Sequence, residues 1–104
     1  SVFNIPQITK SYIVINALSV DDVRKSIGKF GGRVVYVNAY EISTKHLGKP
    51  IVNTTMLGAL LKVLDLVDIE TVKELVLETF GKKLGKSNVD ALEEAYKVAE
   101  VVVL

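Results

Sequence analysis

The sequence contains no cysteine, and this absence excludes a whole set of sites. Without a thiol the chain cannot form a disulfide framework, bind a metal through sulfur, carry an iron–sulfur cluster or use a nucleophilic cysteine. The sequence also has a single histidine, His46, and no carboxylates at a spacing that would complete a metal site around it. We therefore expect His46 to be a surface or helix-end residue and the chain to bind no metal.

The sequence also lacks an excess of charge of one sign, and it lacks long apolar runs. The thirteen Lys and Arg residues nearly balance the twelve Asp and Glu residues, so no strong electrostatic field attracts nucleic acid or an anionic membrane. Charged residues interrupt every apolar segment before it reaches the roughly 20 residues that cross a bilayer. We expect a soluble, cytoplasmic protein with no nucleic-acid or membrane partner.

Familiar catalytic signatures are missing as well. The sequence has no P-loop, no G-x-G-x-x-G turn after a strand, no H-E-x-x-H and no nucleophile elbow, so we expect no catalytic residue in it. It opens on Ser1 without the basic region and apolar run of a secretory signal, which suggests an internal start.

What is present is an apolar fraction of 49%, enough for one compact core, and we expect residues 1–104 to form a single domain.

Residues 11–17 are β-branched and aromatic, as in a parallel strand that is covered on both faces. Ser19 and Asp22 mark the start of a helix that ends at the glycine pair 31–32. Residues 33–37 follow as a second strand. This order predicts a right-handed βαβ unit with parallel strands.

An extended segment at Lys49-Pro50 follows a short helix, and after Pro50 the pattern is helical to the end of the chain. The apolar residues of 54–66 fall on nearly every face of a helix, which indicates burial on several sides and a contact surface in a larger assembly. We expect Gly58 to allow close packing of this helix. The fold class is thus α/β: a parallel βαβ layer, which is a Rossmann-like three-layer fragment, followed by a helical C-terminal half. The expected helices are 38–47, 54–66 capped by Asn53, 68–81 capped by Asp68, and one from about residue 87, after a mobile basic loop at 81–86.

Asn16 and Asn38 follow the two strands at their carboxyl ends, where open parallel sheets bind ligands and partners. They are candidates for contact with a ligand or another subunit. The alternative, which we favour, is that they end the strands by bonding neighbouring backbone groups.

The start of the apolar helix supplies the other candidates, Asn53, Thr54 and Met56. A helix N-terminus can hold a phosphate or a carboxylate, whereas in the alternative Asn53 only caps its own helix. The three lysines between residues 82 and 86 either contact an anionic cofactor or form a solvated connector.

From residue 48 onward the sequence resembles a known family. An extended G-x-P-I-x-N leads into a T-x-M-L-G-A helix, as at the end of the gamma subunit, or gamma domain, of pyruvate and related 2-oxoacid:ferredoxin oxidoreductases, the pyruvate synthase type. The strands SYIVINA and RVVYVNA, the helix EISTKHLG and a closing N-x-x-A-x-x-x-A-Y keep the family order. The resemblance covers nearly the whole chain after about Lys10, but the G-x-G-G-Q-G turn that opens a full gamma subunit is absent. The residues that match the first motif are Gly48, Pro50, Ile51, Asn53, Thr54, Met56, Leu57, Gly58 and Ala59.

The resemblance implies a non-catalytic portion of an enzyme complex that oxidatively decarboxylates pyruvate or a related 2-oxoacid to acyl-CoA and reduces ferredoxin. Thiamine diphosphate and iron–sulfur clusters would lie in alpha, beta and delta-type subunits. Coenzyme A and ferredoxin would interact with the chain only through the complex. This chain alone would bind none of these cofactors and would be inactive. The alternative is a non-enzymatic α/β module that self-associates or binds a nucleotide-like ligand at the carboxyl edge of its sheet.

Overall fold

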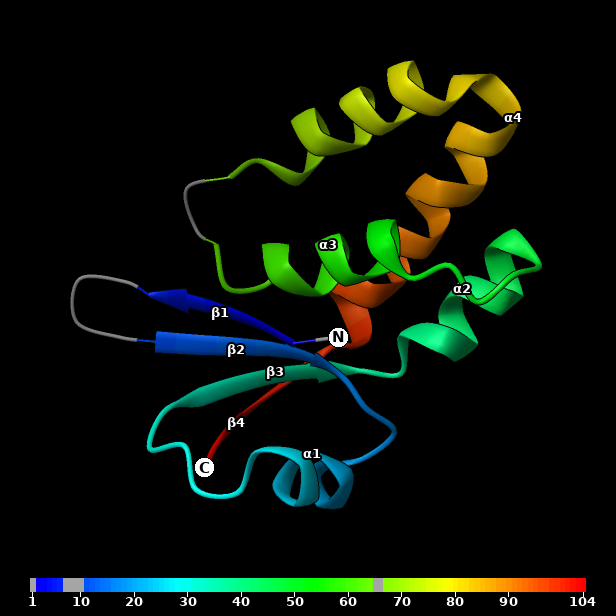
Figure 1. Ribbon diagram of the computed structural model, residues 1–104. Helices are drawn as coiled ribbons and strands as arrows, with labels where there is room; N and C mark the ends of the chain where they lie inside the picture. The colour runs from blue at the N-terminus through cyan, green and yellow to red at the C-terminus, as the bar shows by residue number, and fades with distance from the viewer. Residues whose placement is uncertain (1, 7–10, 65–66) are drawn as a thin grey trace.

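The computed structural model describes residues 2–6, 11–64 and 67–104. Its elements are β1 (Val2–Pro6), β2 (Ser11–Asn16), α1 (Val20–Ile27), β3 (Arg33–Val37), α2 (Ala39–Leu47), α3 (Asn53–Leu61), α4 (Ile69–Val98) and β4 (Glu100–Val103). The strands form one sheet in the order β1-β2-β3-β4. Helix α1 covers one face of this sheet, and α3 and α4 are stacked over the other (Figure 1).

Strands β2 and β3 form the predicted parallel βαβ unit, with α1 as the crossover. The strand residues from Tyr12 to Ile15 are at most 7% exposed, because layers of helix cover both faces of β2. Tyr12 and Val14 point into the core beneath α3, and Ile13 and Ile15 into the core above α1. The expected fold class, a three-layer α/β fragment with a helical C-terminal half, is confirmed.

Two further strands flank this pair, and the sequence pattern predicts neither. Strand β1 is antiparallel to β2, and β4 is antiparallel to β3. The prediction that the chain is helical to its end was wrong, since α4 stops at Val98 and the backbone becomes extended. The three valines of β4 are β-branched, and pairing with β3 outweighs the helical pattern that precedes them.

Helix α1 begins where the sequence predicts and ends earlier. The hydroxyl oxygen of Ser19 caps it by accepting a hydrogen bond from the backbone N–H of Asp22 at 3.2 Å. The helix ends at Gly28, whose φ of +69° breaks the helical path before the glycine pair 31–32 is reached. Phe30 therefore lies beyond the helix, although it still packs against the core above α1.

Helix α3 is shorter than predicted, and Asn53 does not cap it. Asn53 is the first helical residue, and the preceding residue, Val52, offers no side-chain acceptor to the helix start. The helix ends at Leu61, and residues 65–66 of the predicted helix lie outside the described part of the chain.

The apolar surface of α3 is covered largely by its own chain. Met56 and Ala59 pack onto the sheet, and Leu57 and Leu61 pack against α4. Helix α3 is thus sandwiched between the sheet and α4, which explains why its apolar residues lie on nearly every face. Its composition alone does not require another subunit.

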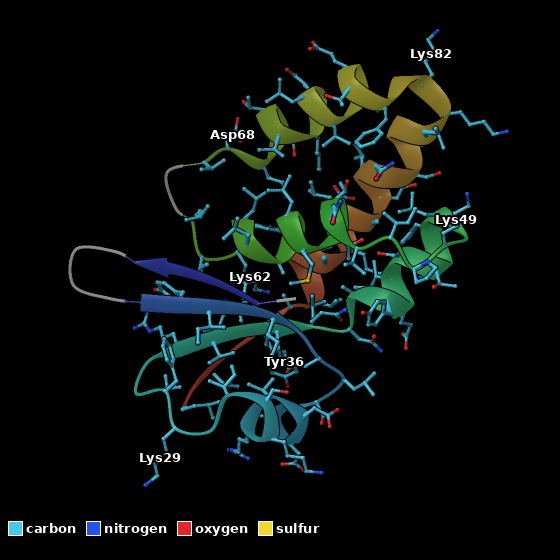
Figure 2. All side chains as sticks on the ribbon, viewed as in Figure 1. Lys29, Tyr36, Lys49, Lys62, Asp68 and Lys82 are labelled. Carbon is cyan, nitrogen blue, oxygen red and sulfur yellow. The ribbon has the colours of Figure 1, made fainter. Side chains whose placement is uncertain are left out.

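Helix α4 has two segments that meet at a kink. Gly81 has φ 81° and ψ 177°, values that a helix does not contain, so the predicted stop at Gly81 was right. The predicted mobile loop at 81–86 was wrong, because the second helical segment resumes directly after the kink. Lys82 projects outward there, away from the rest of the chain (Figure 2).

A buried hydroxyl pair joins α2 to α3. The Oγ atom of Ser43 lies 2.7 Å from the Oγ1 atom of Thr55, and both residues are fully buried. This hydrogen bond satisfies two polar groups that would be costly to bury alone. It fixes α2 beside α3 at the carboxyl edge of the sheet.

In the described ranges no helix is long and apolar enough to span a membrane.

Candidate functional site

The carboxyl ends of β2 and β3 place Asn16 and Asn38 at one edge of the sheet. The Oδ1 atom of Asn16 accepts a hydrogen bond from the backbone N–H of Ala39 at 2.9 Å. Asn38 caps α2, since its Oδ1 atom accepts from the backbone N–H of Glu41 at 3.3 Å and its Nδ2 atom donates to the Glu41 carboxylate. Both side chains bond backbone groups, Asn38 within its own helix start and Asn16 at the start of α2, which agrees with the favoured alternative.

A hollow of about 350 Å³ lies at this edge of the sheet, beside Asn38. Among the described residues, three carboxylates line it, and no lysine or arginine does. Such a lining disfavours a phosphate or carboxylate ligand, so these residues do not fit a diphosphate or the nucleotide end of coenzyme A. The lining residues are Leu18, Tyr36, Val37, Asn38, Glu41, Ile42, Glu94, Val98 and Glu100.

Glu94 connects this hollow to the last turn of α2. Its Oε1 atom accepts a hydrogen bond from the Lys45 ammonium at 2.9 Å and lies 2.7 Å from the His46 Nε2 atom. The hydrogen bonds from Lys45 and His46 hold the pKa of the Glu94 carboxyl below its ordinary value. The prediction that His46 is a helix-end residue is confirmed, because it lies in the last turn of α2.

Replacing Glu94 with glutamine is expected to lower the free energy of unfolding by about 1 kcal/mol at pH 7, as for a partly exposed ion pair. Folding lowers the pKa of Glu94, so its contribution is complete above the ordinary value of 4.5 and is lost as the pH falls through the folded-state pKa. Urea unfolding of both proteins at pH 7 and pH 3 measures this difference. Glu78→Gln, an exposed change on the same helix, is the control. A Glu94→Gln deficit that persists undiminished at pH 3 would contradict the ion-pair origin.

Tyr36 also lines the hollow. Its hydroxyl donates a hydrogen bond to the Glu100 carboxylate, and this bond, together with burial, raises the pKa of Tyr36. The contact joins Tyr36 of β3, which is labelled in Figure 2, to Glu100 of β4. Glu100 is therefore held in place by its own chain.

A second hollow, of about 420 Å³, is a groove between α3 and the first segment of α4. We call it the apolar groove. Leu75 is 56% exposed and Phe80 is 44% exposed, although both are large apolar residues. Apolar side chains gathered on one open surface are typical of a protein contact site. The lining residues are Thr54, Leu57, Leu61, Leu64, Val67, Val72, Leu75, Val76, Thr79 and Phe80.

The five candidate residues do not form one site. Asn16 and Asn38 lie at the sheet edge, and Thr54 is buried in the wall of the apolar groove. Met56 is enclosed in the core beneath α3 at 2% exposure, and Asn53 is exposed at the start of that helix. Within the described ranges, no group of three or more acidic residues, histidines or cysteines is placed to hold a metal ion.

These observations define a three-layer α/β fold with an apolar groove on its helical side. The sequence model of the family described as pyruvate ferredoxin/flavodoxin oxidoreductase matches residues 4–98, and the chain belongs to this family.

Relatives and a solved structure agree with this assignment. The gamma subunit common to the pyruvate and ketoisovalerate oxidoreductases of Thermococcus kodakarensis is 40% identical over 84 residues, which are 81% of this chain and 45% of that protein. The pyruvate synthase subunit PorC of Methanocaldococcus jannaschii is 42% identical over 84 residues, or 81% of this chain and 44% of that protein. The chain thus spans less than half the length of these relatives.

The structural match is to the crystal structure of pyruvate oxidoreductase subunit PORC from Thermotoga maritima. It has a TM-score of 0.78 and 28% sequence identity, and covers 88% of this chain and 52% of that one. The resemblance read from the sequence motifs is confirmed at the level of family and subunit type.

Proposed function

We propose that the chain is the C-terminal portion of the gamma subunit of a 2-oxoacid:ferredoxin oxidoreductase and that it supplies contacts, not catalytic groups. The family match over residues 4–98 carries this proposal. The whole complex would oxidatively decarboxylate pyruvate or a related 2-oxoacid in the cytoplasm, pass the acyl group to coenzyme A and reduce ferredoxin. Thiamine diphosphate and iron–sulfur clusters would lie in alpha, beta and delta-type subunits.

Residues 1–104 would form one domain within that subunit. The Cα radius of gyration is 13.6 Å, close to the value of about 13 Å for a compact 100-residue domain. The same core joins β2 and β3 to α2, α3 and the second segment of α4, which supports a single folding unit.

The apolar groove is the surface that we propose for contact with a neighbouring subunit. It leaves Leu75 and Phe80 half-exposed, and burying them would remove apolar area from water. Asn53, exposed at the start of α3, and Thr54, in the wall of the groove, would contact the neighbour. Met56 would act from the core by holding α3 in place.

A charge placed in the groove tests this assignment. In cells that contain the whole complex, the tagged full-length subunit is expected to co-purify with iron and thiamine diphosphate, and the purified material to reduce ferredoxin with a 2-oxoacid and coenzyme A. Leu75→Glu is expected to abolish this co-purification, because a carboxylate would be buried without a partner. Leu84→Glu, at a residue that is 61% exposed and outside the groove lining, is expected to keep it.

The two parts of the proposal fail separately. If the unchanged subunit purifies without iron and thiamine diphosphate, as a homo-oligomer, its membership of the complex is wrong. If Leu75→Glu and Leu84→Glu recover equal amounts of both cofactors, the groove is not the contact surface.

A further inference from the structure

The two segments of α4 are held by the rest of the chain to very different degrees. The second segment, residues 82–98, crosses α3 so closely that a Cβ atom at Gly58 would lie 2.1 Å from the carbonyl oxygen of Leu92. The first segment, residues 69–80, we call the arm. Within α4, all of which the structure describes, Val76 is the one buried residue of the arm, whereas the second segment buries Gly85, Asn88, Ala91, Leu92 and Ala95.

The apolar groove is a second sign that the arm is loosely packed. A hollow of about 420 Å³ separates part of the arm from α3, and Leu75 and Phe80 stay half-exposed at its opening. Packed protein interiors contain few voids larger than a water molecule. A segment with few buried apolar contacts opens at a low free-energy cost. The arm is therefore the part of α4 that opens most easily.

Gly81 lies where the arm and the second segment diverge, at the bend of α4 in Figure 1. Its φ of 81° and ψ of 177° belong to a region that essentially only glycine adopts. Among the described residues, no atom lies within 4 Å of the place where a Cβ atom would be, so the backbone has room to turn. Hinges are a few residues that absorb large changes in φ and ψ, and Gly81 meets this requirement.

An ion pair between Lys73 and Glu93 connects the arm to the second segment across this bend. The Lys73 side chain is only 16% exposed, and it also contacts Glu70 within the arm. The hydrogen bond to Glu93 raises the pKa of Lys73, and the same bond lowers the pKa of Glu93, so folding favours the charged form of both groups. Of the ion pairs formed by described residues of α4, this one alone joins its two segments.

We propose that the arm is hinged at Gly81, that the Lys73–Glu93 ion pair holds it closed, and that its opening widens the apolar groove to admit a neighbouring subunit. Opening separates Val76 from Leu61, while the close crossing at Gly58 keeps the second segment on α3. The role in admitting a neighbour rests on the proposed function. The hinge itself does not, because it depends only on contacts within the described residues.

Hydrogen exchange of the full chain, measured by mass spectrometry, tests the hinge. Amides of residues 69–80 are expected to exchange faster than those of residues 82–98. Lys73→Met keeps the apolar stem and removes the ammonium, so it is expected to speed exchange of the arm about two- to five-fold, the weight of one ion pair. Glu93→Gln is expected to act in the same direction while it leaves the Lys73–Glu70 pair in place. The control Lys86→Met breaks an ion pair with Asp90 inside the second segment and is expected to leave the arm unchanged.

A disulfide across the bend closes the hinge in the otherwise cysteine-free chain. A Cβ atom at Gly85 would lie 3.0 Å from the Leu77 Cα atom, so cysteines at these two positions are within bonding reach. Oxidation of the double variant Leu77→Cys/Gly85→Cys is expected to slow exchange of the arm, and reduction to restore it. Added to the remaining subunits of the complex, the purified full-length variant is expected to retain less iron and thiamine diphosphate when oxidised than when reduced.

The hinge is overturned if the arm exchanges no faster than residues 82–98, or if Lys73→Met changes the arm no more than Lys86→Met does. Equal retention of iron and thiamine diphosphate by the oxidised and reduced double variant overturns the role of opening in subunit contact. Neither result resembles failure of the proposed function, in which the unchanged subunit itself retains neither iron nor thiamine diphosphate.

Discussion

Replacing Gly58 with alanine is expected to lower the free energy of unfolding by about 3 kcal/mol, the upper range for overpacking a core. A Cβ atom at this position would lie 2.1 Å from the carbonyl oxygen of Leu92, and that oxygen belongs to the backbone of α4. The two helices must separate to admit the methyl group. The loss outweighs the roughly 1 kcal/mol by which alanine is the better helix former. Urea unfolding monitored by circular dichroism measures the change.

Gly85 provides the comparison for this substitution. It is also a buried glycine inside a helical segment, but a Cβ atom there would meet the Leu77 Cα atom at 3.0 Å, a much milder contact. Gly85→Ala is therefore expected to cost far less than Gly58→Ala. Equal losses at the two positions would show that the close crossing of α3 and α4 at Gly58 does not set the requirement for glycine.

Truncating Leu92 to alanine is expected to cost about 2–5 kcal/mol, the range for removing a large side chain from a packed core. Leu92 is fully buried between α3 and the two segments of α4, where Leu61 and Val76 surround it. Its loss leaves a cavity that the kinked helix cannot easily fill.

Leu84 is the matched control, because it is a leucine of the same helix that is 61% exposed. Leu84→Ala is expected to change the free energy of unfolding by less than about 0.5 kcal/mol. Thermal or urea unfolding of both variants checks the pair. A small effect at Leu92 would mean that α3 and α4 are not joined as tightly as the structure indicates.

Local signals were sufficient for the βαβ unit and for several helix ends. Ser19 and Asp68 cap the helices where the spacing predicts, and Gly48 ends α2 in the left-handed conformation. Each of these features depends on residues within one or two turns of chain. Short stretches of sequence therefore contain all the residues that set these features.

The errors fell where distant residues decide the structure. Val103 continues the helical spacing of the last predicted helix, and only pairing with the edge of β3 makes residues 100–103 a strand. Residues 82–86 look like a loop because they combine glycine with lysine, yet they are helical, and Gly85 packs closely against Leu77 of the preceding segment.

The candidate site shows the same division. The positions of Asn16 and Asn38 at one edge of the sheet could be predicted, because the carboxyl edge of a parallel sheet follows from the order of its elements. The apolar groove could not be predicted from the sequence. Its opening depends on the direction that α4 takes before the kink at Gly81, and no local pattern near Leu75 encodes that direction.

The contact between Tyr36 and Glu100 joins residues that are 64 positions apart, and this separation bears on the order of folding. Closing so long a loop costs entropy that is regained only when the helices in between have docked. The fourth strand therefore completes the sheet late, and refolding is expected to be slower than for a helical protein of the same size. Until then the flank of β3 stays open to other chains, so aggregation during refolding at high concentration is the hazard built into this topology.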